Sequence, residues 1–466
     1  MPNSDVDIDA TAVVAPVVET TTYTMVTSIE SGRHYIITNG ANKAMGGQNN
    51  NNRAGVDITV TEGVASVTSD AGVCELVING PDVNGNYTIY DATTPGYLFA
   101  ASSGSNYLRT REFNIDANSQ WTITFDEENS AVITAQGSNT HNLMRFNSGS
   151  NIFSCYGSGQ NPIYLYLKDE DTNYEFFTDV MGYGEEEGGW QLIASPVNSN
   201  TEPTEAMLSN EYDLYAFDAT QSMEWRNHKA ATFQLAPKAG YLYANSANTT
   251  LHFEGQPNTN GGVNIAYTSS SSHNGWNLIG NPFGQAAYLA DGRSFYVMNE
   301  EGTNIILAED NGINMGQGIF VVATSANDNQ VTFTTTAPTK AKALAINLSE
   351  DNVLVDRSAI RFDNSRNLEK VMLNKENSHL FFAQDGSEYA VVNAESRGEK
   401  SLIIKVKANT QYTISVSMEN ISFERLVLID SLTGDSIDLL KNPNFYFQSD
   451  NEEVINRFKI EFVEKK

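Results

Sequence analysis

The sequence predicts an all-β protein of three successive β-sandwich or β-barrel domains, the middle one built from an internal duplication. Short alternating apolar segments such as Trp121–Phe125 and Leu402–Val406 recur about every 8–12 residues, separated by Gly, Asn, Asp and Ser. Helical periodicity is almost absent, and the 22 Phe and 21 Tyr agree with half-buried pleated surfaces. A length of 466 residues accommodates about three such domains.

Polar stretches divide the chain into blocks. Residues 1–22 form an acidic, Thr- and Ala-rich lead that we expect to be disordered. Residues 169–188 mix acids with glycines, and residues 337–344 hold Pro, Ala and Lys after a strand-like segment, so both are predicted linkers. The blocks left between them are an accessory β-domain at 23–168, a duplicated β-domain at 189–336 and a C-terminal β-sandwich at 345–466.

The most specific pattern is an internal repeat in the middle block. Gly189–Pro196 reads GWQLIASP, and Gly275–Pro282 reads GWNLIGNP. Each copy continues to an aromatic segment, then to a glycine-led strand, and then to a short apolar alternation, in the same order. Two copies in one order predict duplicated β-units that share a core.

The residue types of the repeat fit a strand that ends at a turn. Pro196 and Pro282 lack the amide donor of a strand ladder, so they end the strand. Asn281 can hydrogen-bond nearby backbone and set the turn. Gly189 and Gly275 permit a tight entry or the close approach of another backbone.

Large aromatic side chains are candidates both for the core and for ligand contact. We expect Trp190 and Trp276 to be core residues because Leu and Ile flank them, and the alternative is an exposed platform on which sugars stack. Trp225 has polar neighbours and is the better candidate for an exposed aromatic. With Tyr241 and Tyr243 it is predicted to contact a ligand, against the common alternative that such residues are buried.

The motifs of the common catalytic classes are absent. The chain has no G-x-S-x-G elbow, no H-E-x-x-H, no P-loop and no G-x-G-x-x-G. None of its six histidines lies close enough to another in sequence to chelate a metal with it, which leaves open a site assembled from distant residues. We therefore predict no catalytic residues, no metal site and no enzyme activity.

Two acid runs are candidates for a cation site. Asp169–Asp171 and Glu185–Glu187 offer the oxygen ligands that Ca²⁺ prefers. No EF-hand spacing surrounds them, so solvated linker charge is the expected interpretation and no cofactor is predicted.

The net charge of −29 opposes nucleic-acid and anionic-membrane partners, and no apolar run reaches the roughly 18 residues of a membrane helix.

The two cysteines and the N-terminal residues indicate in which cellular compartment the protein is expected. We expect Cys74 and Cys155 to be buried thiols, the alternative being a disulfide formed in an oxidising compartment. The first residues lack the basic and apolar regions of a signal peptide. We expect a mature region or the downstream piece of a longer exported protein.

Several segments resemble parts of known protein families. Gly275–Phe283 (GWNLIGNPF) resembles a repeat common in large secreted and surface proteins of Bacteroidota. Leu428–Gly434, with Arg457–Ile460, resembles the β-sandwich that often precedes a type IX sorting tail in those proteins, and the block ending in Ile163–Lys168 looks like an accessory domain found in them. The chain stops at Lys466, where such a tail would begin, so export uses another route or the tail is missing.

The resemblance implies an extracellular or cell-surface location and carries over no catalytic residue. With the missing motifs, it implies a non-catalytic module that is structural or adhesive and binds a glycan or a host or cell-surface protein weakly. The alternative is the C-terminal accessory region of a split or truncated secreted hydrolase, either a protease or a glycosidase.

Overall fold

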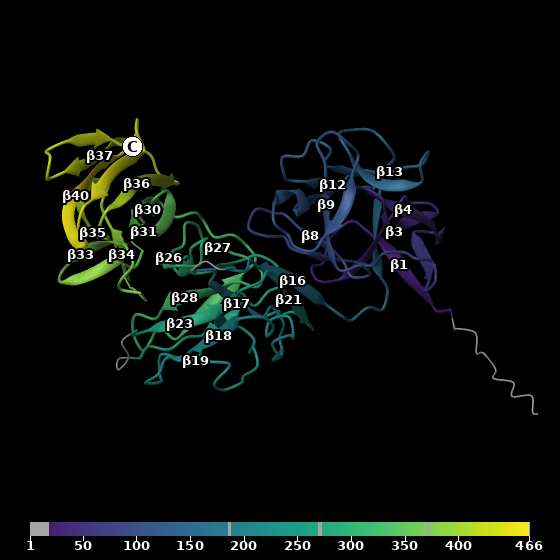
Figure 1. Ribbon diagram of the computed structural model, residues 1–466, viewed down its shortest axis with the longest axis horizontal. Helices are drawn as coiled ribbons and strands as arrows, with labels where there is room; N and C mark the ends of the chain where they lie inside the picture. Colours follow the sequence, from purple (N-terminus) through teal and green to yellow (C-terminus); the bar gives the residue numbers. More distant parts are fainter. Residues whose placement is uncertain are drawn as a thin grey trace, which may run out of the picture. The chain divides into compact units, whose positions relative to one another are not determined.

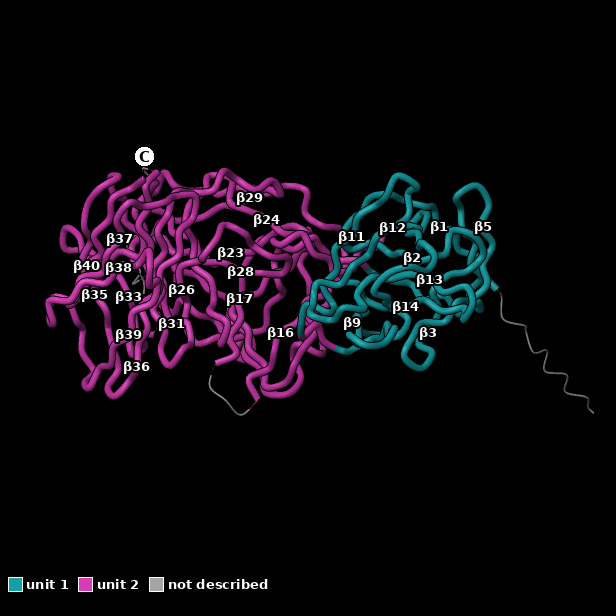
Figure 2. The backbone as a smooth tube through the Cα atoms, turned by 90° about the horizontal axis from the view of Figure 1, so that it is seen from above, with its two compact units in different colours: residues 1–77, 89–112, 116–171 teal, residues 78–88, 113–115, 172–466 magenta. Residues whose placement is uncertain are grey.

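The computed structural model describes residues 18–184, 188–268, 273–363, 365–370, 372 and 374–465. It divides into two compact units, one made of residues up to 77, 89–112 and 116–171, and the other of residues 78–88, 113–115 and 172–466 (Figure 2). The predicted all-β fold is confirmed, since the described residues form strands and a single short 3-10 turn at Ala117–Ser119 (Figure 1).

The N-terminal block is a continuous antiparallel sheet. Its strands are β1 (Thr20–Val26), β2 (His34–Thr38), β3 (Lys43–Asn49), β4 (Asn52–Asp57), β5 (Thr59–Thr61), β6 (Val64–Thr68), β7 (Leu76–Asn79), β8 (Thr88–Asp91), β9 (Gly96–Ala100), β10 (Leu108–Arg111), β11 (Trp121–Phe125), β12 (Ala131–Ala135), β13 (Leu143–Asn147), β14 (Ile152–Tyr156) and β15 (Tyr164–Lys168). β2 pairs with β3, β7 and β15, and β1 pairs with β6 and β15. The hairpins β3–β4, β9–β10 and β13–β14 bring β4, β10 and β14 into mutual contact.

Two predicted non-globular stretches contain regular structure. β1 starts at Thr20, inside the predicted lead, and pairs along Thr20–Thr24 with β6; residues 1–17 lie outside the described residues. β16 (Glu175–Val180) lies inside the predicted acidic linker and pairs along its whole length with β21 (Thr249–Glu254). The apolar Phe176 and Val180 are buried, which explains why this acidic stretch is a strand. Glu185–Glu187 lie outside the described residues.

The middle block contains two four-stranded sheets of the same strand order. The first copy has β17 (Gln191–Ala194), β18 (Tyr212–Phe217), β19 (Trp225–Asn227) and β20 (Gly240–Asn245), and the second has β23 (Trp276–Gly280), β25 (Tyr296–Met298), β26 (Ile305–Leu307) and β28 (Gly318–Val322). Their orders are β17–β20–β18–β19 and β23–β28–β25–β26. Ala194 pairs with Gly240 as Gly280 pairs with Gly318, so the registers match too. This topology agrees with the predicted duplication.

The remaining strands of the block flank these sheets. β16 and β21 form a pair beside the first copy, and the corresponding strands β22 (Gly262–Asn264) and β29 (Gln330–Thr334) pair beside the second. The second copy adds β24 (Ala287–Leu289) and β27 (Gly312–Ile313), which extend that sheet.

Equivalent positions of the two copies contact each other. The amide of Ala194 donates to the carbonyl oxygen of Gly316 at 2.7 Å, and the amide of Gly280 donates to that of Lys238 at 2.9 Å. Gly316 lies two residues before Gly318 of β28, and Lys238 lies two residues before Gly240 of β20. Because these are equivalent positions of the two copies, the two hydrogen bonds are reciprocal, as around a local twofold axis. The copies therefore contact through backbone as well as side chains.

Gly240 and Gly318 stand where the copies come closest. A Cβ atom at Gly240 would lie 2.7 Å from the carbonyl oxygen of Ile279, and one at Gly318 would lie 2.9 Å from that of Ile193. Both distances are shorter than real Cβ contacts with a backbone oxygen. A larger residue at either position would push the two sheets apart.

The motif residues lie as the sequence predicts at the turn. The side-chain amide of Asn281 donates to the carbonyl oxygens of Gln285, Ile313 and Asn314 at 2.9–3.0 Å, and its oxygen accepts from the amide of Phe283 at 3.0 Å. Pro196 and Pro282 are buried directly after their strands. Gly189 and Gly275 have φ of +68° and +73°, which favours glycine at both.

The C-terminal block is a two-layered sandwich, as predicted. One layer contains β30 (Ala343–Glu350), β31 (Val353–Arg361), β32 (Leu368–Glu369), β34 (Ser387–Asn393), β36 (Thr410–Glu419) and β39 (Asn444–Ser449). The other contains β33 (His379–Gln384), β35 (Arg397–Val406), β37 (Phe423–Asp430), β38 (Ser436–Asp438) and β40 (Glu453–Glu464), and the β33–β34 hairpin joins the two. The inner faces share one apolar core that includes Leu344, Ile414, Ile404 and Phe458.

The middle and C-terminal blocks share a hydrophobic cluster. Trp276, Tyr296 and Phe320 of the second copy pack with Ala359 and Val391 of the sandwich. This burial explains why the two blocks form one compact unit, which corrects the prediction of separate domains at 189–336 and 345–466. The expected linker at 337–344 ends inside β30.

Substitution of Gly240 by Ala should lower the free energy of unfolding by about 1–3 kcal/mol, because the added methyl group meets backbone that cannot move alone. The matched control is Gly262→Ala, whose nearest neighbours are the side chains of Asn260 and Gln330 at 3.2 and 3.6 Å. Chemical denaturation of both variants provides the measurement. Equal stabilities would contradict the close approach.

The two repeat tryptophans should differ in their contribution to stability. Trp276 is 2 % exposed and its ring lies 5.0 Å from that of Phe320, whereas Trp190 is only half-buried, contrary to the prediction that it is a core residue. Trp276→Ala should cost about 3–5 kcal/mol because it empties a closed core site. Trp190→Ala should cost clearly less, since part of that ring already contacts solvent. Thermal unfolding of the two variants makes the comparison, and a larger loss for Trp190→Ala would show that the assignment is wrong.

Candidate functional site

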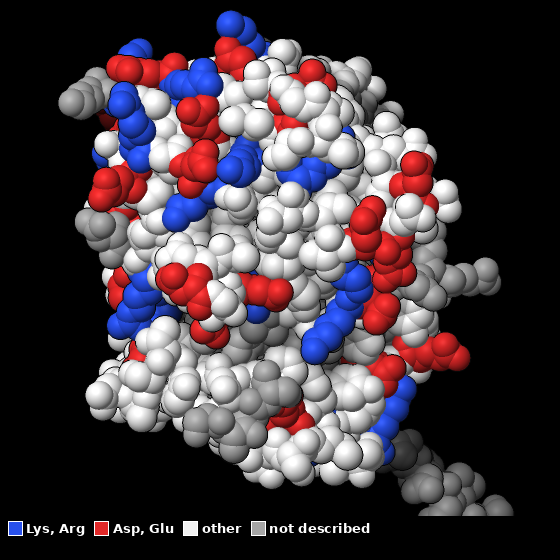
Figure 3. Space-filling view, turned by 90° about the vertical axis from the view of Figure 1, so that its left-hand side faces the viewer, with Lys and Arg blue, Asp and Glu red and all other residues white. Residues whose placement is uncertain are grey.

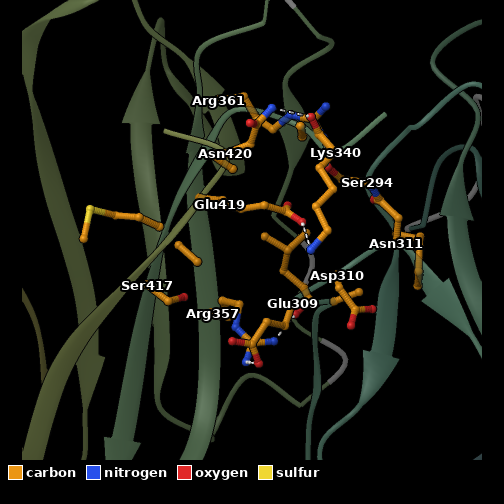
Figure 4. Close-up of a pocket in the computed structure, with 18 residues that line it drawn as sticks. Ser294, Glu309, Asp310, Asn311, Lys340, Arg357, Arg361, Ser417, Glu419 and Asn420 are labelled. Carbon is orange, nitrogen blue, oxygen red and sulfur yellow. Dashed lines mark hydrogen bonds and ion pairs between the residues drawn. The ribbon is translucent and has the colours of Figure 1, made fainter. Parts of the chain in front are cut away.

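A cavity of about 470 Å³ lies between the second copy of the repeat and the sandwich (Figure 4). Strands β30, β31 and β36 and the segments 294–295 and 307–311 supply its walls. Small apolar side chains form part of the lining, and the polar lining residues are Ser294, Glu309, Asp310, Asn311, Lys340, Arg357, Arg361, Ser417, Glu419 and Asn420.

Arg357 is buried at one wall of this cavity and is held by three neighbours. Its guanidinium donates to the side-chain oxygen of Asn347 at 2.6 Å, to the carbonyl oxygen of Leu307 at 3.0 Å and to Glu309 at 3.0 Å. Burial lowers the pKa of Arg357 from its ordinary value, and the charge of Glu309 opposes that shift. These contacts fix the guanidinium in one orientation.

Arg361, four residues further along β31, is held in the same way. Its Nη2 donates to the carboxylate of Asp363 at 2.6 Å, and its Nη1 donates to the hydroxyl of Ser294 at 3.3 Å. Burial raises the pKa of Asp363, but hydrogen bonds from Arg361 and Ser365 outweigh burial and hold that pKa below its ordinary range. Both arginines therefore present preorganised N–H groups rather than mobile charges.

The charges around the cavity balance. Arg357, Arg361 and Lys340 provide three positive charges, and Glu309, Asp310 and Glu419 provide three negative ones. Lys340 and Glu419 point toward each other, with Nζ 3.7 Å from the carboxylate (Figure 4). With the amides and hydroxyls nearby, the lining offers many donors and acceptors and no net charge.

The cavity continues into a second hollow of about 540 Å³ that shares Ser294, Asn311 and Arg361 with it. Arg293 and Arg366 reach Asp328 there at 2.8 Å each. Basic and acidic groups are interspersed in the same way on the face of the molecule seen in Figure 3, in accord with the ion pairs Arg425–Glu461 and Lys459–Glu399 of the sandwich.

The lining contains no nucleophile with an adjacent base. Ser294 and Ser417 are the only hydroxyl side chains in it, and no histidine or cysteine accompanies them. In the part of the chain that the structure describes, no group of three or more His, Cys, Asp or Glu side chains is placed to hold a metal ion. The arrangement of these side chains fits binding by hydrogen bonds.

The three predicted contact aromatics lie elsewhere. Tyr241 and Tyr243 are 4 % and 0 % exposed, and the Tyr243 hydroxyl donates to the carbonyl oxygen of Met207 at 2.9 Å. The prediction that these two tyrosines contact a ligand is wrong, because both rings pack in the apolar core of the first copy. Trp225 is half-buried with its ring 4.9 Å from that of Phe217, and its contact with a ligand stays a prediction.

Sequence reasoning missed the residues that line the cavity. They come from segments near 294, 309, 340, 357 and 418, which meet only in the folded unit. The local signal was the pair Arg357 and Arg361, two cations at an even spacing in a strand whose other residues are mostly apolar. That spacing places both side chains on one face.

Both cysteines are free and buried, which confirms the expectation of buried thiols over a disulfide. Burial raises the pKa of Cys74 to about 11, although the charge of Arg53 opposes the shift. The guanidinium of Arg53 donates to the sulfur at 2.8 Å and is itself fully buried with Asp91. Burial also raises the pKa of Cys155 above its ordinary value.

Comparisons with known proteins give little guidance. No family model matches the sequence, and no curated protein matches it. Similar solved structures include the crystal structure of Cry35Ab1, 8% identical over 91% of this chain and 90% of that one, with a TM-score of 0.24. Another is a mosquitocidal holotoxin, 11% identical over 93% of this chain and 69% of that one, with a TM-score of 0.24. At these scores the likeness bears on neither site nor function.

Among the described residues, no helix is both long enough and apolar enough to cross a membrane.

The two thiols should resist alkylation in the native protein at neutral pH, because the reactive thiolate is disfavoured by burial at both positions. Iodoacetamide labelling followed by mass spectrometry should show slow modification of Cys74 and Cys155, and rapid modification of both in denaturant. The Arg53→Met variant loses the hydrogen-bond donor to Cys74. When its fold is intact, the rate of Cys74 labelling in this variant is the informative comparison with the wild type. Rapid labelling of native wild-type protein at both sites would contradict the buried state.

Proposed function

We propose that the protein is a non-catalytic, secreted or cell-surface module that binds a neutral glycan in the cavity beside Arg357. The observation that carries the proposal is the lining of the cavity, which is rich in fixed donors and acceptors and balanced in charge. A neutral polyol can pair with both kinds of group, whereas an anionic or cationic ligand would leave part of the lining unpaired.

The size and the openness to solvent of such a site set the expected affinity. A cavity of about 470 Å³ accommodates a small saccharide and falls within the range of small-molecule sites. Single-site binding of a polar ligand that displaces water corresponds to a dissociation constant of micromolar to millimolar, or about −8 to −4 kcal/mol. Adhesion would then require several copies of the module on one surface.

An exposed location agrees with the composition. The net charge of −29 keeps the chain soluble and repels anionic partners, which favours a neutral ligand. The resemblance of the GWNLIGNPF segment to surface proteins supports the same location. We expect no hydrolysis of peptides, esters or glycans by the purified chain.

Filling the cavity tests the proposal. Ser417→Trp should abolish binding on a neutral-glycan array, because the indole would occupy the space that the saccharide needs. Gln411→Trp is the matched control, since residue 411 lies on the same face of β36 outside the cavity and should leave binding unchanged.

Three results on the array would argue against the proposal. Equal binding by the two tryptophan variants would place the ligand elsewhere, and absence of binding by the wild-type chain would leave the module purely structural. Turnover of an arrayed substrate that is lost on substitution of a single histidine or acid would show an enzyme.

A further inference from the structure

A lysine and an aspartate are buried against each other inside the sandwich. Asp356 lies in β31, and Lys370 directly follows β32. Both side chains are 1 % exposed, and Nζ of Lys370 lies 2.5 Å from Oδ1 of Asp356. The ammonium has one further acceptor at the limit of hydrogen bonding, the carbonyl oxygen of Arg357 at 3.5 Å.

Backbone amides surround the carboxylate of Asp356. The amide of Arg357 donates to Oδ1 at 2.8 Å, and the amide of Leu380 donates to Oδ2 at 2.6 Å. These donors would stabilise negative charge that develops on the oxygens when a nucleophile adds to Cγ, as in an oxyanion hole. Once a proton has passed to the carboxylate, the same donors would polarise the carboxyl group for acyl transfer.

His379 completes the group. Its Nε2 lies 2.8 Å from the carbonyl oxygen of Asn374, which only accepts, so Nε2 carries the hydrogen. Its Nδ1 lies 3.6 Å from Oδ2 of Asp356. Burial raises the pKa of Asp356, but the charges of Lys370 and His379 outweigh burial and keep that pKa below its ordinary value. The carboxylate of Asp356 is therefore ionised at rest.

An ionised pair in this position is costly, because both groups have lost water and the pair is closed off from solvent. A neutral amide would remove both buried charges and release one water molecule. The geometry for that reaction exists, since Cγ is one bond beyond Oδ1 and so lies within about 4 Å of Nζ. Groups held in this way react with effective molarities of about 10⁵–10⁸ M.

We propose that Lys370 and Asp356 condense to an intramolecular amide that cross-links β31 to the segment after β32. One proton passes from the ammonium to the carboxylate, and the nitrogen lone pair attacks Cγ to form the C–N bond. A C–O bond then breaks, and the oxygen leaves as water with the transferred proton and a second proton from the nitrogen. Charge and atoms balance without an oxidant, a reductant or a cofactor.

Solvated ion pairs of the same sandwich provide the comparison. Lys342 lies 2.9 Å from Glu464, but the two side chains are 48 % and 20 % exposed. Water solvates both charges of such a pair, so condensation to an amide would relieve no desolvation cost and contact distance alone does not lead to one. Burial distinguishes the Lys370–Asp356 pair.

Peptide mass spectrometry of the full chain tests the proposal. Trypsin does not cleave after an acylated lysine, so the digest should contain residues 343–357 joined to residues 367–375, with a mass lower than that of the two peptides by one water. Fragmentation should place the link at Asp356 and Lys370. Separate, unmodified peptides ending at Arg357 and at Lys370 in the wild-type digest would overturn the proposal.

The Lys370→Arg variant is the matched control, because it keeps the positive charge while its guanidinium forms no such amide. Its digest should lack the joined peptide, and its circular dichroism should show whether the sandwich is intact. Lys342 and Glu464 should remain unlinked in every sample. A peptide that joins residues 343–357 to any part of residues 367–375 in Lys370→Arg would refute the assignment to Lys370, and the wild-type digest decides the question even if the variant does not fold.

Discussion

The close approach of the two repeat copies is the constraint on which the rest of the second unit depends. The hydrogen bonds from β17 to Gly316, just before β28, and from β23 to Lys238, just before β20, require backbone in contact, and only glycine at positions 240 and 318 leaves room for it. This contact brings Leu192 of the first copy into the same cluster as Trp276 and Phe320. The sandwich packs on that cluster, and the cavity lies where the second copy and the sandwich meet.

Much of this architecture could be predicted from the sequence, because its signals are local. Alternation at period two specifies strands, and a motif repeated in order specifies equivalent strands. The burial of Trp276 and the hydrogen bonds of Asn281 follow from the neighbours of each residue. What failed depended on tertiary context. β16 is an acidic segment that becomes a strand by pairing with β21, which lies far along the chain. Tyr241 and Tyr243 are buried by the core of the first copy, which exists only in the folded chain.

The candidate site was less accessible to sequence reasoning than the fold. Its charged residues come from distant segments, and most of them form an ordinary ion pair when considered alone. Only the folded arrangement shows that three cations and three anions surround one hollow. The same applies to Asp356 and Lys370, whose side chains read as solvated surface charge until both are found inside a sandwich.

The reciprocal contacts between the copies have the form of an isologous dimer interface, in which each partner presents the same patch to the other. A chain with a single copy of the unit would expose backbone donors and acceptors complementary to those of a second molecule. Gene duplication and fusion would convert that association from an intermolecular to an intramolecular one, independent of concentration. Once fused, the copies would be free to diverge, and the cavity beside Arg357 has a wall from the second copy.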